Sequence, residues 1–140
     1  MQVVDMARRL RREAQANDES WSRLLLLGAI DRHGAEATPS VLADAESMRS
    51  SNLAAALRDL DQRGLISRTP DASDRRKVRV ALTPLGQSTL RENRSRRERW
   101  LAQAMSACLS GEERVRLIEA GELIERLLAY AGAAATDGDD

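Results

Sequence analysis

The stretch GLISRTPDASDRRKVRVALTPLG, residues 64–86, decides the fold of this chain. It predicts two short strands, the first opened by Leu65 and Ile66 and followed by the turn-forming residues 70–73. The apolar residues of the second strand alternate with Lys77, Arg79 and Ala81, the pattern of a half-buried strand: Val78, Val80 and Leu82. A hairpin with one apolar face and a cationic loop at residues 74–77 is typical of a surface that meets an anionic partner.

Helical periodicity surrounds this hairpin on both sides. Thr38-Pro39 and Thr83-Pro84 each combine an N-cap side chain with Pro in the first turn, and Ser110 with Glu113 fits a capping box. Gly34 and Gly64 are placed to end helices. These signals predict helices over residues 3–16, 21–32, 39–46, 50–63, 84–107 and 112–131.

The two short helices before the hairpin fit a helix-turn-helix unit, because only a brief turn at residues 47–49 separates them. Their expected inward residues are Val41, Leu42 and Ala45 in the first helix, and Leu53, Ala56, Leu57 and Leu60 in the second. The apolar run 24–30 is expected at the centre of a buried helix. Together these elements predict a mainly α, α+β winged-helix fold.

Composition narrows the class of protein. Hydrophobic residues make up 42% of the 140 residues but aromatic residues only 2%, so Leu and Ala must form the core. No apolar run approaches the roughly 20 residues of a membrane span, and no secretory signal follows Met1. The single Cys excludes an internal disulfide framework and a Cys-based zinc cluster. We expect a cytoplasmic protein without membrane contact, cofactor or metal.

The zero net charge of the chain hides an uneven distribution. Residues 49–99 hold 13 Arg or Lys and 6 Asp or Glu, a net of +7, and the rest of the chain carries −7. A solvated arginine-rich surface is the simplest explanation of such a run on its own. The adjoining hairpin favours contact with phosphates instead.

The sequence resembles the MarR (multiple antibiotic resistance regulator) family over nearly its whole length. One motif is LAAALRDLDQRGL, residues 53–65, which is similar to the recognition helix leading into the wing of that family. The other is Asp74-Arg75-Arg76 followed by Val80-Ala81-Leu82-Thr83, which fits the family's D-x-R-x-x-x-V-x-L-T wing signature. The resemblance implies a single MarR-type domain over 1–140, with a winged helix-turn-helix at 21–83 and dimerisation helices at 1–16 and 84–131. The small and acidic residues of 132–140 predict a disordered tail.

The family likeness and the side-chain chemistry together nominate DNA-binding residues. The start of the recognition helix offers Arg49, Ser50, Ser51 and Asn52 to base edges, assisted by Arg58. Ser50 is also the expected helix cap. In the wing, the resemblance implies that Arg76 enters the minor groove and that Asp74 braces the turn, with Arg75 and Lys77 on phosphates. Ser40 is a further phosphate-contact candidate. Ala54 and Ala55 stand where relatives often carry polar side chains, so direct readout is expected to be concentrated at residues 49–52.

The same resemblance implies a homodimer, a pseudo-palindromic double-stranded DNA site and, commonly, repression released by a small-molecule effector. The apolar helices at the two ends of the chain fit burial against a second copy. Asn93 and Arg97 face either the central cavity of the dimer or the surface, and Trp21 and Trp100 either pack in the core or line an effector pocket. Surface or capping roles are expected for His33 and a buried, inert thiol for Cys108.

Two alternatives remain. A winged-helix module that contacts protein would fit the alanines of the recognition helix, and an effector-independent DNA-binding protein would fit the lack of any clear inducer site. An enzyme is not expected, since the single His leaves no Ser-His-Asp or Cys-His set, and there is no glycine-rich phosphate loop.

Overall fold

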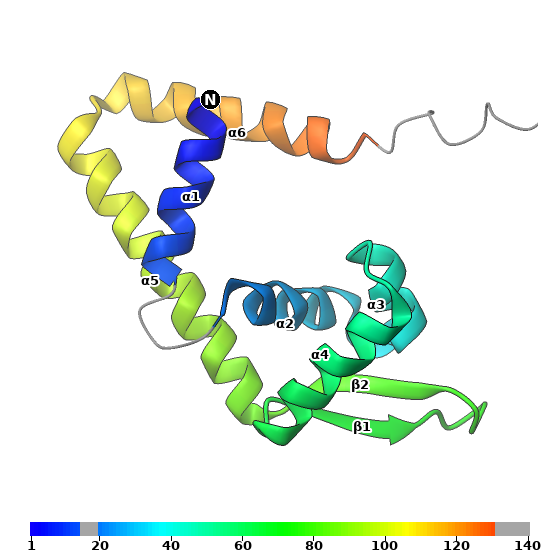
Figure 1. The fold of residues 1–140 in the computed structure, drawn as a ribbon. Helices are drawn as coiled ribbons and strands as arrows, with labels where there is room; N and C mark the ends of the chain where they lie inside the picture. The colour runs from blue at the N-terminus through cyan, green and yellow to red at the C-terminus, as the bar shows by residue number, and fades with distance from the viewer. Residues whose placement is uncertain (15–19, 131–140) are drawn as a thin grey trace, which may run out of the picture. The chain divides into compact units, whose positions relative to one another are not determined.

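A computed structural model describes residues 1–14 and 20–130. The described residues up to Arg99 belong to one compact unit and those from Trp100 onward to a second. The elements are α1 (Gln2–Ala14), α2 (Trp21–His33), the short 3₁₀ helix η1 (Gly34–Glu36), α3 (Pro39–Ala45), α4 (Ser50–Gln62), β1 (Ile66–Pro70), β2 (Val78–Leu82), α5 (Pro84–Cys108) and α6 (Gly111–Leu128) (Figure 1). This order confirms the mainly α winged-helix class. Residues 15–19 and the tail expected at 132–140 lie outside the described residues.

Three side chains cap helices where the sequence predicts it. The Thr38 hydroxyl accepts from the Val41 amide at 3.4 Å, and the Thr83 hydroxyl accepts from the Gly86 amide at 3.1 Å. Ser110 and Glu113 form the complete capping box. Each cap satisfies amides that lack a partner in the first turn of a helix, which is why these helices begin where they do.

The hairpin is antiparallel, with Ile66 paired to Leu82 and Pro70 to Val78. Fewer residues of β2 are buried than the alternation predicts, since Val80 is 1% exposed but Val78 is 37% exposed. The Val80 amide donates to the Ala37 carbonyl at 2.9 Å. This bond joins β2 to the segment after η1, so the base of the hairpin is fixed to the helical part of the unit.

One core joins the helix-turn-helix, the hairpin base and the start of α5. Its largest fully buried side chains are Leu27, Ile30, Leu42, Leu53, Leu57, Leu60, Val80 and Asn93. The run 24–30 is buried as predicted except for Leu25, which is 43% exposed. The prediction for α3 was wrong at one position: Ala43 is buried and Ala45 exposed. Ala45 is the last residue of α3, and the chain turns there through Ser47, whose φ is 50°.

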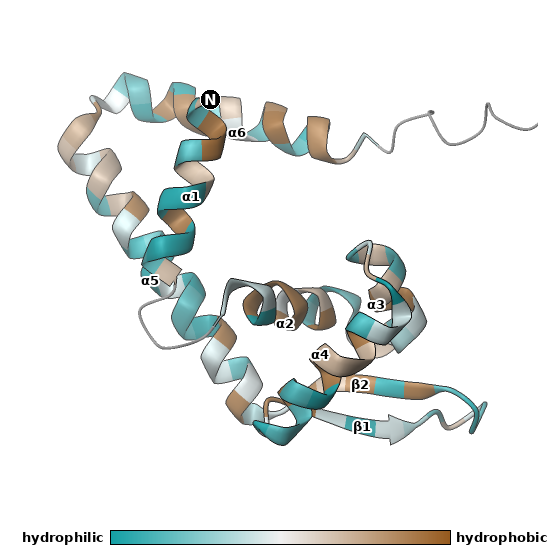
Figure 2. Ribbon diagram, viewed as in Figure 1, coloured by the Kyte–Doolittle hydropathy of each residue, from teal (hydrophilic) through white to brown (hydrophobic). Residues whose placement is uncertain are grey.

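The apolar side chains of α6 are not covered by the residues that the structure describes. No residue of α6 is buried, and large hydrophobic side chains are exposed along its length: Val115, Leu117, Ile118, Leu123, Ile124, Leu127 and Leu128. Figure 2 shows these apolar positions alternating with hydrophilic ones. In α1, likewise, Val3, Val4 and Met6 are exposed and only Ala14 is buried.

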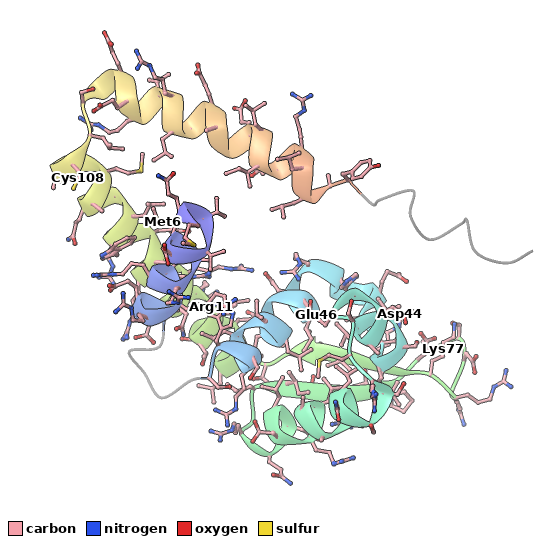
Figure 3. All side chains as sticks on the ribbon, turned by 45° about the horizontal axis from the view of Figure 1, so that its top comes forward. Met6, Arg11, Asp44, Glu46, Lys77 and Cys108 are labelled. Carbon is pink, nitrogen blue, oxygen red and sulfur yellow. The ribbon has the colours of Figure 1, made fainter. Side chains whose placement is uncertain are left out.

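The expected buried thiol was also wrong for the chain as it stands. Cys108 is exposed (Figure 3). The residue is the last of α5, and none of the described residues covers it.

Candidate nucleic-acid interface

Helix α4 begins without a side-chain cap. Arg49 takes the N-cap position with an extended backbone (φ −65°, ψ 141°), and its carbonyl accepts from the Leu53 amide at 3.0 Å. Ser50 is the first helical residue, so the expectation that Ser50 caps the helix was wrong. The amides of the first turn therefore stay available to an outside acceptor, and the helix dipole favours a negative one there.

One face of α4 is turned to solvent while the other is in the core. Leu53, Leu57 and Leu60 are buried. The exposed side carries the candidate readers, at positions spaced three and four residues apart: Ser51, Asn52, Ala55 and Arg58. Of the two alanines expected on this face, Ala55 is exposed and Ala54 is half-buried.

Ion pairs fix the far end of α4 to the helix that supports it. The Asp59 carboxylate accepts from Arg23 Nε of α2 at 2.6 Å and from Arg63 Nε at 3.0 Å. These hydrogen bonds, first that from Arg23, hold the pKa of Asp59 below its usual 3.8. Gly64, with φ 69°, then ends the helix and turns the chain into β1. The orientation of α4 is thus set by its buried side and by charge pairing at its end.

The wing tip, residues 74–77, is exposed except for Asp74. Asp74 Oδ1 accepts from the Arg76 amide at 3.1 Å and from Arg76 Nε at 3.2 Å. The Asp74 carbonyl accepts from the Lys77 amide at 2.9 Å. Asp74 is therefore placed to brace the turn while the Arg76 side chain remains 92% exposed. Figure 3 shows Lys77 at the far end of the hairpin.

Sequence reasoning missed a buried carboxylate at the base of this loop. Asp71 is only 4% exposed. Its Oδ1 accepts from the Ser73 amide and hydroxyl, both at 2.7 Å, and from the Asp74 amide at 3.1 Å; its Oδ2 accepts from Arg79 Nε at 2.5 Å. These bonds, led by that from the Ser73 hydroxyl, hold the pKa of Asp71 far below its usual range. An Asp two residues before a Ser was the available signal, as an Asx turn.

Two further residues singled out by the sequence, Ser40 and His33, lie on the same compact unit. Ser40 is exposed in the first turn of α3 and shares a hydrogen bond with the Thr38 hydroxyl at 3.2 Å. His33 is the last residue of α2 and half-buried.

A cavity of about 160 Å³ lies between α2 and the first half of α5. Its apolar wall is formed by the side chains of Leu24, Leu25 and Leu90, and three arginines reach its edge: Arg32, Arg94 and Arg97. Arg94 Nη1 bonds to Asp31 at 2.9 Å and Arg32 Nη2 to Glu46 at 3.3 Å.

Unpaired polar atoms gather beside this cavity. Among the described residues, Trp21 Nε1, Asn93 Oδ1 and Arg97 Nε are buried without a hydrogen-bond partner. The Arg97 guanidinium lies 5.6 Å from the centre of the Trp21 ring, and burial, aided by Arg94, lowers the pKa of Arg97. Trp21 also packs against the core, and Asn93 is 2% exposed. Trp21 thus lines the cavity and also packs against the core, whereas Asn93 lies in the interior.

The described residues carry no group of three or more His, Cys, Asp or Glu side chains that could hold a metal. Within the same residues, no helix has the length and apolarity needed to cross a membrane.

A helix-turn-helix with an exposed second helix, followed at once by a cationic hairpin, defines a winged-helix DNA-binding protein of the transcriptional-regulator class. The MarR family model matches residues 20–78. The chain is 30% identical over 126 residues to the HTH-type transcriptional regulator MT0903.1 of Mycobacterium tuberculosis (strain CDC 1551 / Oshkosh), covering 90% of this chain and 87% of that protein. The chain belongs to the MarR family of transcriptional regulators.

Solved structures agree with this assignment. A crystal structure of a Pseudomonas aeruginosa PA01 protein, designated a candidate transcriptional regulator, is 52% identical with a TM-score of 0.82, over 91% of this chain and 89% of that one. The F27L mutant of S. aureus MepR, solved bound to an oligodeoxyribonucleotide, is 22% identical with a TM-score of 0.70, over 89% and 91% of the two chains. The second likeness concerns the fold.

Proposed function

We propose that this regulator is a repressor that binds a pseudo-palindromic operator as a homodimer and leaves it when a small organic anion binds. The observation that carries the DNA-binding mode is the pairing, on one compact unit, of an uncapped and exposed α4 start with a braced but exposed Arg76. The oligonucleotide bound by MepR, which shares the fold, supports the same mode for this chain.

In this proposal the first turn of α4 enters the major groove. Arg49 and Asn52 have the donors and acceptors that read guanine and adenine, and Ser50 and Ser51 suit bases or phosphates. Ala55, exposed on the same face, offers a methyl group to a thymine methyl. Arg58, one turn further along, assists the readout of bases, and Ser40, at the start of α3, is assigned to the DNA backbone.

The wing is proposed to enter the adjacent minor groove. Arg76 extends from the tip, and an arginine there reads groove width through the electrostatic potential rather than through base identity. Arg75 and Lys77, both exposed, add contacts to phosphates. The wing therefore supplies affinity and shape readout, while sequence readout rests with α4.

A second copy of the chain is the proposed cover for the apolar sides of α1 and α6. The exposed valine, leucine and isoleucine side chains of α6 form a surface that a lone domain would rarely leave in water. Two-fold symmetry would place two α4 helices about one turn of DNA apart, which requires a pseudo-palindromic site.

The effector is proposed to bind in the cavity between α2 and α5. The unpaired Trp21 Nε1 and Arg97 Nε are both donors, so a carboxylate would satisfy both, while Leu24 and Leu90 would pack against an apolar body. Arg32 links such a ligand to the helix-turn-helix, because it lines the cavity and also pairs with Glu46. Its partner Glu46 is the C-cap residue directly after α3 (Figure 3), so an anion that draws Arg32 away removes a contact to the turn before α4.

A selection from random double-stranded DNA with the purified full chain tests this proposal, repeated in the presence of benzoate as a small aromatic carboxylate. We expect an inverted-repeat motif whose enrichment falls with benzoate. Enrichment of a single, unrepeated motif would contradict the dimer, and unchanged enrichment with benzoate would favour the effector-independent protein. Failure to enrich any DNA would favour the protein-interaction module.

A further inference from the structure

We infer that Asp71 and Arg79 form a lock that positions the minor-groove arginine of the wing, and that DNA affinity depends on this lock although neither residue needs to touch DNA. The inference rests on the proposed role of Arg76 and adds two positioning residues to it.

Burial sets Asp71 apart from the rest of its loop. It is 4% exposed, whereas Ala72, Ser73, Arg75, Arg76 and Lys77 are all exposed. A carboxylate withdrawn from water needs several hydrogen bonds to offset the loss of hydration. Asp71 has four of them, from three residues, at 2.5–3.1 Å. Such a group fixes the backbone around it, because each bond that breaks leaves a charge without compensation.

The bonds form a continuous path from the strand to the tip. Arg79, in β2, donates to Asp71; Asp71 accepts from the Asp74 amide; and the Asp74 carboxylate accepts from both the amide and Nε of Arg76. Backbone bonds from Asp71 N to Lys77 O and from Lys77 N to Asp74 O, both 2.9 Å, close the loop across its base. Through these bonds, β2 fixes the position of the Arg76 backbone.

The strand end of this path is itself fixed to the helical part of the unit. Arg79 Nη1 lies 4.0 Å from the Glu36 carboxylate of η1, and the neighbouring Val80 amide donates to the Ala37 carbonyl. Arg79 is half-buried, unlike the freely exposed Arg76. Its guanidinium is therefore part of the structure of the wing, whereas the Arg76 side chain extends into solvent.

A preformed loop raises affinity because less conformational entropy is lost by Arg76 when DNA binds. Asp71→Asn keeps an oxygen that accepts from Ser73 and Asp74 but removes the charge that pairs with Arg79. The loop then retains its turn and loses the ion pair that joins it to Arg79 of β2. We expect Arg76 to sample more orientations in this variant.

A double-mutant cycle on DNA affinity tests the lock, using the full chain and one operator at fixed salt: wild type, Asp71→Asn, Arg76→Ala and the double variant. We expect Asp71→Asn to weaken binding about fivefold to tenfold when Arg76 is present and less than about twofold when it is Ala, as one coupled unit requires. Arg96→Gln, which breaks a surface pair with Glu92 on α5, is the matched control and should leave affinity unchanged.

An equal loss in both backgrounds would overturn the inference, because Asp71 would then act on the fold rather than through Arg76. If Asp71→Asn lowers the unfolding midpoint below the assay range, Arg79→Lys serves as the milder variant, since it removes the Nε donor to Asp71 and keeps a positive charge beside the carboxylate. The proposed function fails separately: wild type would then show no DNA binding, or Arg76→Ala would bind as wild type does.

Discussion

The carbonyl of Leu65 occupies the space in which a side chain at Gly86 would have to begin. Gly86 lies in the first turn of α5 and is buried, and the Leu65 carbonyl accepts from the Thr83 amide at 3.1 Å. The start of the hairpin and the start of α5 are thus in backbone contact, and this contact sets where the long helix leaves the winged helix.

Gly86→Ala is therefore expected to destabilise the chain by about 1–3 kcal/mol, as for other substitutions that overfill a packed site. The free energy of unfolding in urea, at one protein concentration, measures this. Gly111→Ala is the matched control, because a Cβ there meets nothing within 4 Å, and it should be neutral or stabilising. Equal behaviour of the two variants would show that the contact between Leu65 and Gly86 has no energetic weight.

The division of labour between α4 and the wing predicts different signatures for two variants. Asn52→Ala should relax the preference at one base position in each half-site, at a cost of about 1–3 kcal/mol. Arg76→Ala should weaken binding to many sequences without relaxing the preference at that base position. Affinities for a set of single-base operator variants distinguish them, and the division is wrong if both variants alter preference at the same position.

Stability should depend on pH through Asp59. Hydrogen bonds from Arg23 and Arg63 depress the pKa of Asp59 in the folded chain, so its contribution is present above the ordinary pKa of 3.8 and is lost as pH falls through the lowered value. We expect the free energy of unfolding to fall below about pH 4, and to fall less steeply in Asp59→Asn. Asp44→Asn, at an exposed carboxylate without a salt bridge among the described residues, is the control and should keep the wild-type profile.

The uncovered apolar side of α6 predicts a self-association that one charge can break. Ile118, 59% exposed in the chain, should be buried in the dimer, so Ile118→Glu should elute as a monomer and lose operator affinity. Glu119→Gln, at the next position of the helix, is expected to stay dimeric. Light scattering after size-exclusion chromatography gives the mass of each, and a dimeric Ile118→Glu would rule out this part of α6 as the interface.

The proposed anion site in the α2–α5 cavity predicts that replacing an arginine of the cavity weakens anion binding, whereas replacing one outside it does not. Trp21 fluorescence, followed in a Trp100→Phe background, should change on titration with benzoate, and Arg97→Gln should raise the Kd about tenfold by removing a charged donor. Arg96→Gln, outside the residues that line the cavity, should not raise it. Equal affinities of the two variants would place benzoate elsewhere.

Much of the fold was readable from local chemistry. Thr38-Pro39, Thr83-Pro84 and the Ser110 capping box each combine a side-chain acceptor with a helix start, so their positions were correct to within a residue. The start of α4 was not readable in this way: Ser50 is a good cap by type, but Arg49 takes the position because its backbone is extended there.

The parts of the candidate site that depend on local sequence could be predicted. The parts that depend on contacts between residues distant in the sequence could not. The exposed arginine of the wing follows from charge and turn pattern, but the burial of Asp71 depends on Arg79, which reaches it from the neighbouring strand. Similarly, the unpaired atoms of Trp21 and Arg97 lie 76 positions apart in the sequence and meet only once α2 packs against α5. The exposure of Cys108 depends on how the described helices pack, which a local apolar pattern does not show.

The salt dependence of operator binding tests the central claim most directly. Wild type and Arg76→Ala are titrated by fluorescence anisotropy against DNA from upstream of the protein's own gene, over a range of salt concentrations. We predict tight binding that weakens steeply with salt, and a log–log slope smaller by about one for each Arg76 removed from the bound dimer. Absence of binding at low salt, or identical slopes for the two proteins, would contradict the account.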